Sequence, residues 1–310
     1  MDPAPLHEAV ADAPPGGAAY WLRTEDSVQI RAGFWPDGPR GTVLIFPGRT
    51  EFIEKYGRAA GALGALGFAT ATVDWRGQGM ADRLIDDPGP GHVHRFRDYQ
   101  RDVRALVRAA EAAGLPKPWY LLAHSMGGCI GLRALREGLA VDRAAFTGPM
   151  WGIEIAPPMR PVAWAVSGLS RPLGLSDRLV PGTEARNYVF SSAFEGNTLT
   201  SDREMWDYMR AQMAAHPDMV IGGPTLHWLN EALREVAIMS RLPAPAVPAL
   251  TWIGSEEKIV SIPAVRRRMA SWPGGRLETL AGGQHEVLME TPAIRRRIFA
   301  ALDAFFGTGG

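Results

Sequence analysis

The amino-acid sequence predicts an α/β fold in which a mostly parallel sheet, flanked by helices, is interrupted by a helical insertion. Short apolar runs alternate with stretches of helical spacing over residues 43–147 and again over 250–306. Between 148 and 248 this alternation lapses, and tryptophan, methionine and proline become frequent. Because alternating strands and helices are typical of βαβ units, we expect one central sheet built from the two flanking segments.

The composition is that of a globular protein with a sizeable core. The chain has 310 residues, 46% of them hydrophobic, and a formal net charge of +0, so its overall charge favours neither nucleic acid nor an anionic membrane. The single cysteine, Cys129, excludes an internal disulfide and fits a reducing compartment. No apolar run approaches the roughly 20 residues of a membrane-spanning helix. We expect a cytoplasmic protein, with peripheral contact to a membrane left open.

The N-terminal segment, residues 1–17, is rich in proline, alanine and glycine. It lacks the basic start and the apolar stretch of a signal peptide, and we expect a disordered lead-in. Two apolar runs follow at 20–23 and 29–35, with polar residues between them. This pattern predicts an antiparallel hairpin at the start of the core.

The remaining elements follow from apolar periodicity and from the glycines and prolines that end each segment. Expected strands are 43–46, 68–73, 119–122, 144–147, 250–253 and 277–280, and expected helices are 51–66, 96–113, 129–139, 264–271 and 293–306. We expect a core of residues 18–148 and 249–310, and a helical lid of residues 149–248 over the carboxyl edge of the sheet. Since methionine and tryptophan suit adaptable apolar pockets, Trp151 and Trp228 in this lid are candidate substrate contacts. Packing in the core is the alternative for either residue.

The most informative segment is Ala123-His124-Ser125-Met126-Gly127-Gly128, which joins an expected strand to an expected helix. A strand, a sharp turn with a central serine and a helix form the nucleophile elbow of an α/β-hydrolase. The turn requires small flanking residues. Gly127 meets this need, and Ala123 stands where the usual pattern has glycine. The segment predicts a serine hydrolase in which Ser125 forms a covalent acyl-enzyme.

The same fold requires an acid and a histidine after the serine along the chain. His285, set beside glycines between the last strand and the last helix, is at the expected place for the base. The loop after strand 250–253 contains no aspartate, so the acid must be a glutamate. Glu257 is preferred by its position in the loop, and Glu256 is the alternative.

An oxyanion hole requires two backbone N–H donors directed at the developing negative oxygen. Met126, which follows the nucleophile, supplies one donor, and Arg49, in the loop after strand 43–46, is placed to supply the other. The Arg49 side chain either holds this loop or meets a polar head group. The sequence has no phosphate-binding loop, no dinucleotide fingerprint and no His or Cys cluster at metal-ligand spacing. We expect no cofactor, no metal and no nucleic-acid partner.

These motifs resemble those of the monoglyceride-lipase-like branch of the α/β-hydrolases, and most closely those of bacterial lysophospholipases. Besides the elbow, the matching segments are 46–51, 74–79, 91–96, 98–99, 222–225, 227–228, 256–257 and 285–286. The branch mostly has His-Gly in the oxyanion loop, an aspartate acid and a glycine before the elbow. Pro47, Glu257 and Ala123 stand at those places, as in the lysophospholipase-like group. The resemblance implies Ser125 as the nucleophile, His285 as the base and Glu257 as the acid.

We therefore predict a serine hydrolase that cleaves carboxylic esters of acyl lipids, such as a lysophospholipid or a monoacylglycerol. One alternative is a general carboxylesterase, thioesterase or peptidase that acts on small substrates. The other is a catalytically silent protein that binds a ligand in the same fold. The complete set of serine, histidine and glutamate argues against silent binding, because binding needs no base beside the serine. Acyl length, head group and oligomeric state are left open.

Overall fold

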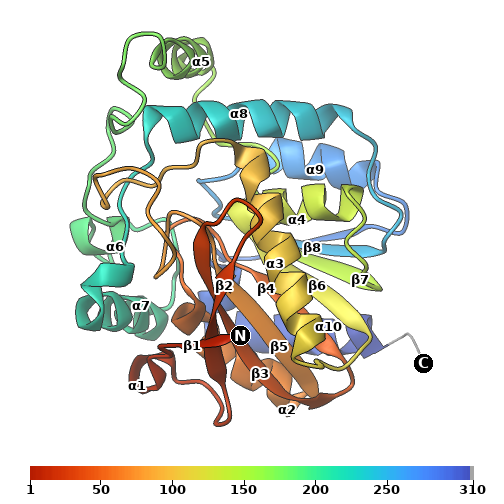
Figure 1. The fold of residues 1–310 in the computed structure, drawn as a ribbon. Helices are drawn as coiled ribbons and strands as arrows, with labels where there is room; N and C mark the ends of the chain where they lie inside the picture. Colours follow the sequence, from red (N-terminus) through yellow and green to blue (C-terminus); the bar gives the residue numbers. More distant parts are fainter. Residues whose placement is uncertain (308–310) are drawn as a thin grey trace.

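The computed structural model describes residues 1–307, and over this range its centre is a nine-stranded sheet in the order β1-β2-β3-β5-β4-β6-β7-β8-β9 (Figure 1). The first three strands pair antiparallel, and β3 pairs antiparallel with β5; the remaining pairs are parallel. The strands are β1 (Asp2–Ala4), β2 (Ala18–Arg23), β3 (Gln29–Pro39), β4 (Thr42–Phe46), β5 (Phe68–Asp74), β6 (Trp119–His124), β7 (Arg143–Thr147), β8 (Ala249–Gly254) and β9 (Arg276–Leu280). This arrangement confirms the predicted mostly parallel α/β sheet.

Helices cover both faces of the sheet, so the central strands β4, β5 and β6 are buried along their whole length. The helices outside the insertion are α1 (Glu8–Ala11), α2 (Gly57–Ala65), α3 (Tyr99–Ala112), α4 (Met126–Arg136), α9 (Ile262–Ala270) and α10 (Pro292–Gly307). Short 3₁₀ turns span Ile53–Tyr56, Phe96–Asp98, Pro217–Met219 and Val287–Met289. In β4, all five residues are buried.

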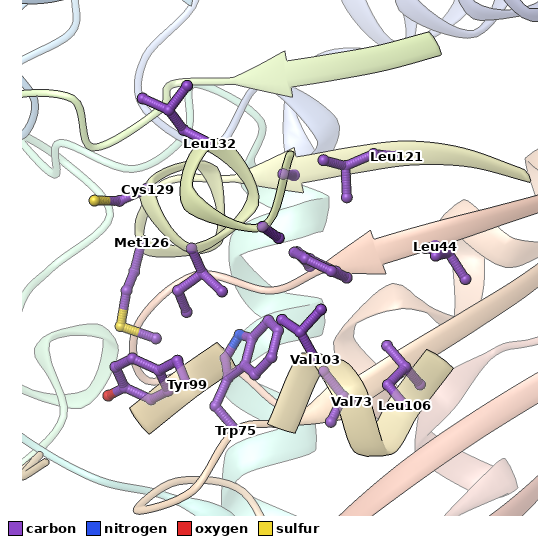
Figure 2. Packing of buried hydrophobic residues seen from close by; sticks show 14 of the residues in the cluster. Leu44, Val73, Trp75, Tyr99, Val103, Leu106, Leu121, Met126, Cys129 and Leu132 are labelled. Atoms are coloured by element: carbon purple, nitrogen blue, oxygen red, sulfur yellow. The ribbon is translucent and has the colours of Figure 1, made fainter. Parts of the chain in front are cut away.

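Alternate residues of each parallel strand enter two different hydrophobic clusters. Leu44 of β4 packs with residues of α3 and α4 on one face, and Figure 2 shows these side chains meeting. Val43 and Ile45 point the other way, into a cluster completed by α2 and α10. The elbow helix α4 is thus fixed on one face of the sheet by its own apolar residues.

The structure contradicts the expectation that residues 1–17 are disordered. Residues 2–4 form the edge strand β1 on β2, and α1 follows with Ala11 fully buried. Polar contacts hold the segment: Arg31 donates to the Pro5 carbonyl (2.9 Å), and the His7 N–H donates to Glu54 (3.2 Å). These partners lie far along the chain, so the composition of residues 1–17 gave no sign of them.

Between β7 and β8 the chain forms helices and contributes no strand to the sheet over the described residues. They are α5 (Met159–Leu169), α6 (Tyr188–Ser191), α7 (Arg203–Ala215) and α8 (Leu226–Arg241). In Figure 1, α8 runs across one end of the sheet with α5 outside it, and α6 and α7 lie to the side. Apolar residues of α7, among them Trp206 and Met209, pack with Phe52 and Met289 of the core.

Candidate active site

Ser125 lies at the turn between β6 and α4 and is half-buried. Its backbone has φ 49° and ψ −116°, a conformation that is costly for a residue other than glycine and that recurs at functional sites. Gly127 is required beside it, because a Cβ there would lie 2.1 Å from the Phe46 carbonyl oxygen. The elbow therefore packs against the end of β4, where the predicted oxyanion loop begins.

The structure brings Ser125, His285 and Glu257 together from three different loops. His285 Nε2 is 2.9 Å from Ser125 Oγ, and His285 Nδ1 is 2.7 Å from Glu257 Oε2. The second oxygen of Glu257 accepts the backbone N–H groups of Ile259 (2.6 Å) and Val260 (3.1 Å). When Nδ1 donates to this carboxylate, Nε2 has a free lone pair that can accept the serine proton.

Of the two candidate acids, Glu257 is the one that contacts the histidine. Burial opposes ionisation of Glu257, but the hydrogen bonds from His285 and from two backbone N–H groups outweigh it and lower the pKa of this carboxyl. Glu256 is exposed, and its carboxylate accepts a hydrogen bond from Ser255 Oγ (3.1 Å). The geometry and the electrostatics both favour a charged Glu257 beside His285.

Met126 and Arg49 line the same cavity as Ser125, and their backbone N–H groups have no hydrogen-bond partner within residues 1–307. Met126 is the first residue of α4, where N–H groups lack an intrahelical acceptor and the helix dipole favours negative charge. Arg49 follows the end of β4, which lies beside β6 in the sheet. Two backbone donors without a partner therefore belong to residues that border the same cavity as Ser125.

The loop that carries Arg49 is held by side chains from other elements. Trp75 Nε1 donates to the Pro47 carbonyl (2.9 Å), and Gln78 Nε2 donates to the Gly48 carbonyl (2.8 Å). The Gly48 N–H donates to the Glu51 carboxylate. A loop with its polar groups satisfied in this way can present a backbone donor without reorganising.

A cavity of about 630 Å³ opens beside Ser125 and His285. Apolar side chains make up much of its wall, with contributions from both the core and residues 149–248: Met126, Met150, Ile153, Val189, Leu199, Met209, Met213, Leu229, Ile259 and Val260. Its volume and lining are typical of a site for a small apolar molecule.

The two tryptophans predicted as substrate contacts have different positions. Trp228, from α8, lines this cavity, and its indole lies beneath the guanidinium of Arg49 (5.6 Å to the ring centroid). Trp151 does not line it. Its ring packs on Phe146 and Trp272, and its Nε1 donates to the Gly128 carbonyl (3.0 Å). Trp151 packs in the core instead, and its contact with a substrate stays a prediction.

A buried ionic cluster behind the serine was not predicted from the sequence. Lys55 Nζ lies 2.5 Å from Glu51 Oε1 and 2.7 Å from Glu286 Oε1. His124 Nε2 lies 3.3 Å from the other oxygen of Glu286. The cluster adjoins the site through neighbours of Ser125 and His285 in the chain, and through the bond from Gly48 to Glu51. The i,i+4 spacing of Glu51 and Lys55 is the one local signal for it.

Charges within this cluster balance one another. Burial opposes ionisation of Lys55, His124 and Glu286. Glu286 and Glu51 nevertheless raise the pKa values of Lys55 and His124, and these cations lower the pKa of Glu286. Oxygen and nitrogen atoms of Glu51, His124 and Glu286 lie within 4.8 Å of one another, close enough to hold a metal ion. The Lys55 ammonium, which contacts both carboxylates, supplies positive charge at this place.

Comparison with known proteins places this geometry in a family. A family model described as serine aminopeptidase, S33, matches residues 37–292. The chain belongs to this α/β-hydrolase family. Lysophospholipase L2 of Escherichia coli K12 is 34% identical over 273 residues, which cover 85% of this chain and 79% of that protein. A probable lysophospholipase L2 of Haemophilus influenzae is 28% identical over 268 residues, covering 86% and 83%.

Solved structures agree with the fold. A soluble variant of monoglyceride lipase from Saccharomyces cerevisiae, in complex with a substrate analogue, matches with a TM-score of 0.70 at 19% identity, over 92% of this chain and 93% of that chain. The predicted resemblance and the predicted α/β-hydrolase fold are confirmed. The chain is accordingly a serine ester hydrolase of this family.

Proposed function

We propose that this enzyme cleaves lysophospholipids or monoacylglycerols through an acyl-enzyme. The observation that carries the proposal is the hydrogen-bonded series Ser125–His285–Glu257 at the wall of a cavity of about 630 Å³ with a largely apolar lining. Relatives named lysophospholipase support the same class of substrate. An ester with a long acyl chain fits both features, because the chain needs apolar surface and the ester needs a nucleophile.

In the proposed mechanism, His285 Nε2 takes the proton of Ser125 Oγ as this oxygen attacks the ester carbonyl. The N–H groups of Arg49 and Met126 stabilise the oxyanion. The tetrahedral intermediate collapses, and His285 returns the proton to the departing glycerol oxygen. Water, activated by the same histidine, then releases the fatty acid, while Glu257 keeps the imidazole in the required tautomer.

We assign the acyl chain to the part of the cavity formed with residues 149–248, which act as a lid. Val189, Met209 and Met213 of this segment line the cavity together with Met126 and Val260 of the core. Methionine side chains adapt to chains of different length, and their wall excludes water from the ester. Activity should therefore rise with acyl length from acetate to medium or long chains.

The outer helix of the lid, α5, is proposed to contact a membrane surface. Its apolar side chains and those just after it are 41% to 65% exposed: Met159, Val162, Trp164, Val166, Leu169, Leu173 and Leu175. Its serines face inward instead, and Asn230 of α8 donates to Ser167 Oγ (3.2 Å). Residues 159–178 contain three arginines and one aspartate, which favours anionic lipid.

Co-sedimentation with vesicles tests this surface. Binding to vesicles containing phosphatidylglycerol should exceed binding to phosphatidylcholine vesicles, and Trp164→Ser with Leu169→Ser should weaken both. Concentration-dependent dimerisation without vesicle binding would assign the face to a second copy instead. No helix within residues 1–307 has the length and apolar character needed to cross a bilayer. The cytoplasmic location expected from Cys129 stays a prediction.

Hydrolysis of a p-nitrophenyl ester series, from acetate to palmitate, tests the main proposal. The wild type should prefer medium or long chains, and Ser125→Ala should lose turnover and reaction with a fluorophosphonate probe while keeping its thermal unfolding. Lysophospholipid and monoacylglycerol of one acyl length are then compared. A folded wild type that neither turns over esters nor reacts with the probe would instead be a silent binding protein.

A peptidase is the second candidate, because the matching family model is described as a serine aminopeptidase. An aminopeptidase must bind the free amine of its substrate, usually with a carboxylate. Among the cavity-lining carboxylates, Glu51 and Glu286 are already paired with Lys55. This leaves the exposed Glu184 to bind the amine of a peptide substrate. Turnover of aminoacyl p-nitroanilides above that of esters would favour this candidate.

A further inference from the structure

We propose that the Arg49 guanidinium binds the phosphate of a lysophospholipid whose ester lies in the oxyanion hole formed with the Arg49 N–H. This inference rests on the proposed esterase function and deepens it, because it selects lysophospholipid over monoacylglycerol. The guanidinium lacks an anionic partner, Arg49 borders the cavity that holds Ser125, and the reach of its side chain matches the substrate.

The Arg49 side chain is a half-buried cation without a carboxylate within 4.0 Å among residues 1–307. Its Nη1 donates to the Gly222 carbonyl (2.7 Å), and its Cζ lies over the Trp228 ring. These contacts orient the group and leave most of its five N–H donors unused. Burial lowers the pKa of Arg49 to about 10, so it is charged at neutral pH. A partly buried charge without a counterion is costly, and an anionic ligand offsets that cost.

The other cations along the cavity are arranged differently. Lys55 is paired with Glu51 and Glu286, so its charge is already balanced by protein carboxylates. Arg186 is exposed at the cavity, with its guanidinium over the Phe190 ring. Arg49 therefore combines an uncompensated charge with a fixed position beside the nucleophile.

The reach of the side chain fits one molecule held at two points. In arginine, the path from the backbone nitrogen to Cζ has as many covalent bonds as the path from the ester carbonyl carbon to phosphorus in a 1-acyl lysophospholipid. An ester carbonyl at the Arg49 N–H therefore places the phosphate near the guanidinium of the same residue. Guanidinium groups bind phosphate with paired, charge-assisted hydrogen bonds. A monoacylglycerol has no group for this contact.

The test compares kcat/KM for 1-lauroyl lysophosphatidylcholine and 1-lauroylglycerol, and takes the ratio of the two. In Arg49→Met this ratio should fall about 10- to 100-fold, because hydrogen bonds between charged groups are lost for one substrate alone. Arg49→Lys should keep part of the preference, and Arg186→Met, the matched control, should leave the ratio unchanged. A side chain that only holds the loop would slow both substrates equally, and that result would overturn the inference.

A measurement on the wild type makes the test independent of the variants' folding. Glycerol 3-phosphate should inhibit hydrolysis of p-nitrophenyl butyrate, whereas glycerol at the same concentration should not. Equal effects of the two compounds would contradict a phosphate site, as would a wild type that cleaves the monoacylglycerol but not the lysophospholipid. Absence of turnover with every ester would instead refute the proposed esterase function, so the two failures are distinguishable.

Discussion

Replacing Glu257 by glutamine tests the proposed role of the acid, because the structure fixes how the new amide must lie. One carboxylate oxygen of Glu257 accepts two backbone N–H groups, and the other accepts from His285 Nδ1. A glutamine side chain has one carbonyl oxygen, so it can accept either from the two backbone N–H groups or from His285 Nδ1, and not from both. Placing its NH₂ against two N–H donors costs more than placing it against one ring nitrogen. In the Glu257→Gln variant, the side-chain NH₂ group therefore faces His285 Nδ1.

This orientation selects the wrong tautomer of His285. With Nδ1 accepting from the amide, the proton moves to Nε2, which can then no longer accept the proton of Ser125 Oγ. The same tautomer change in serine proteases costs about 10⁴-fold in kcat. We expect kcat for a p-nitrophenyl ester to fall by about 10³- to 10⁴-fold, with an unfolding temperature close to that of the wild type.

The matched control is Glu256→Gln, which changes an exposed neighbour of the same charge. It should keep kcat within about twofold, because it leaves Glu257 and His285 paired. The rate of labelling by a fluorophosphonate probe should follow kcat, because both need Ser125 deprotonated. A fall of less than about tenfold in Glu257→Gln, or a larger fall in Glu256→Gln, would refute this reasoning.

Three further predictions concern the surroundings of the site. Lys55→Met leaves the buried carboxylates of Glu51 and Glu286 without their cation. It should lower the free energy of unfolding, measured in denaturant titrations, by about 3–5 kcal/mol. A loss under about 1 kcal/mol would contradict a stabilising role of the ionic cluster. Gly127→Ala would place a Cβ 2.1 Å from the Phe46 carbonyl oxygen, so kcat should fall about 100-fold, whereas Gly64→Ala, which meets nothing within 4 Å, should stay active. Burial, then the neighbouring His227, lowers the pKa of His92 to about 4, below its unfolded value of about 6.5, so the unfolded chain takes up this proton first as pH falls. Stability should therefore fall by at most about 2 kcal/mol from pH 7 to pH 5, and His92→Gln should reduce that fall in thermal unfolding curves.

Much of the fold could be predicted because apolar periodicity is local. The hairpin of β2 and β3 and the strands of the parallel sheet follow from such runs, and their bounds shift by a few residues. The expected helix 51–66 begins instead as a 3₁₀ turn, Ile53–Tyr56, before α2. Its first residue, Glu51, bonds back to the Gly48 N–H and stays outside the helix. A local polar contact holds Glu51 outside the helix, and apolar periodicity does not record such contacts.

In the candidate site too, some residues could be predicted from the sequence and others could not. Ser125 and His285 could be proposed from the elbow motif and the chain order, because the fold fixes which loops meet at the edge of the sheet. Glu257 was preferred over Glu256 by its position in the loop. The ionic cluster could not, since Lys55 and Glu286 lie far apart in the sequence and meet only through the fold. The place of Trp151 could not be predicted for a related reason: composition shows that a segment is rich in tryptophan, and packing decides which rings face the cavity.

The departures at the elbow and the acid are matched by glycines in the structure. Ala123 carries a methyl group where glycine is usual, and it faces Gly131 of α4, where a Cβ would lie 3.3 Å from that methyl. Glutamate is longer than aspartate, and Gly148 gives its carboxylate room. A Cβ on Gly148 would lie 3.3 Å from Glu257 Oε2 and 3.2 Å from His285 Nδ1. The position also has φ 49°, which glycine adopts without strain. A larger residue is therefore accommodated in each case by a nearby glycine: Ala123 by Gly131, and Glu257 by Gly148. A substitution at either glycine would crowd the larger residue beside it.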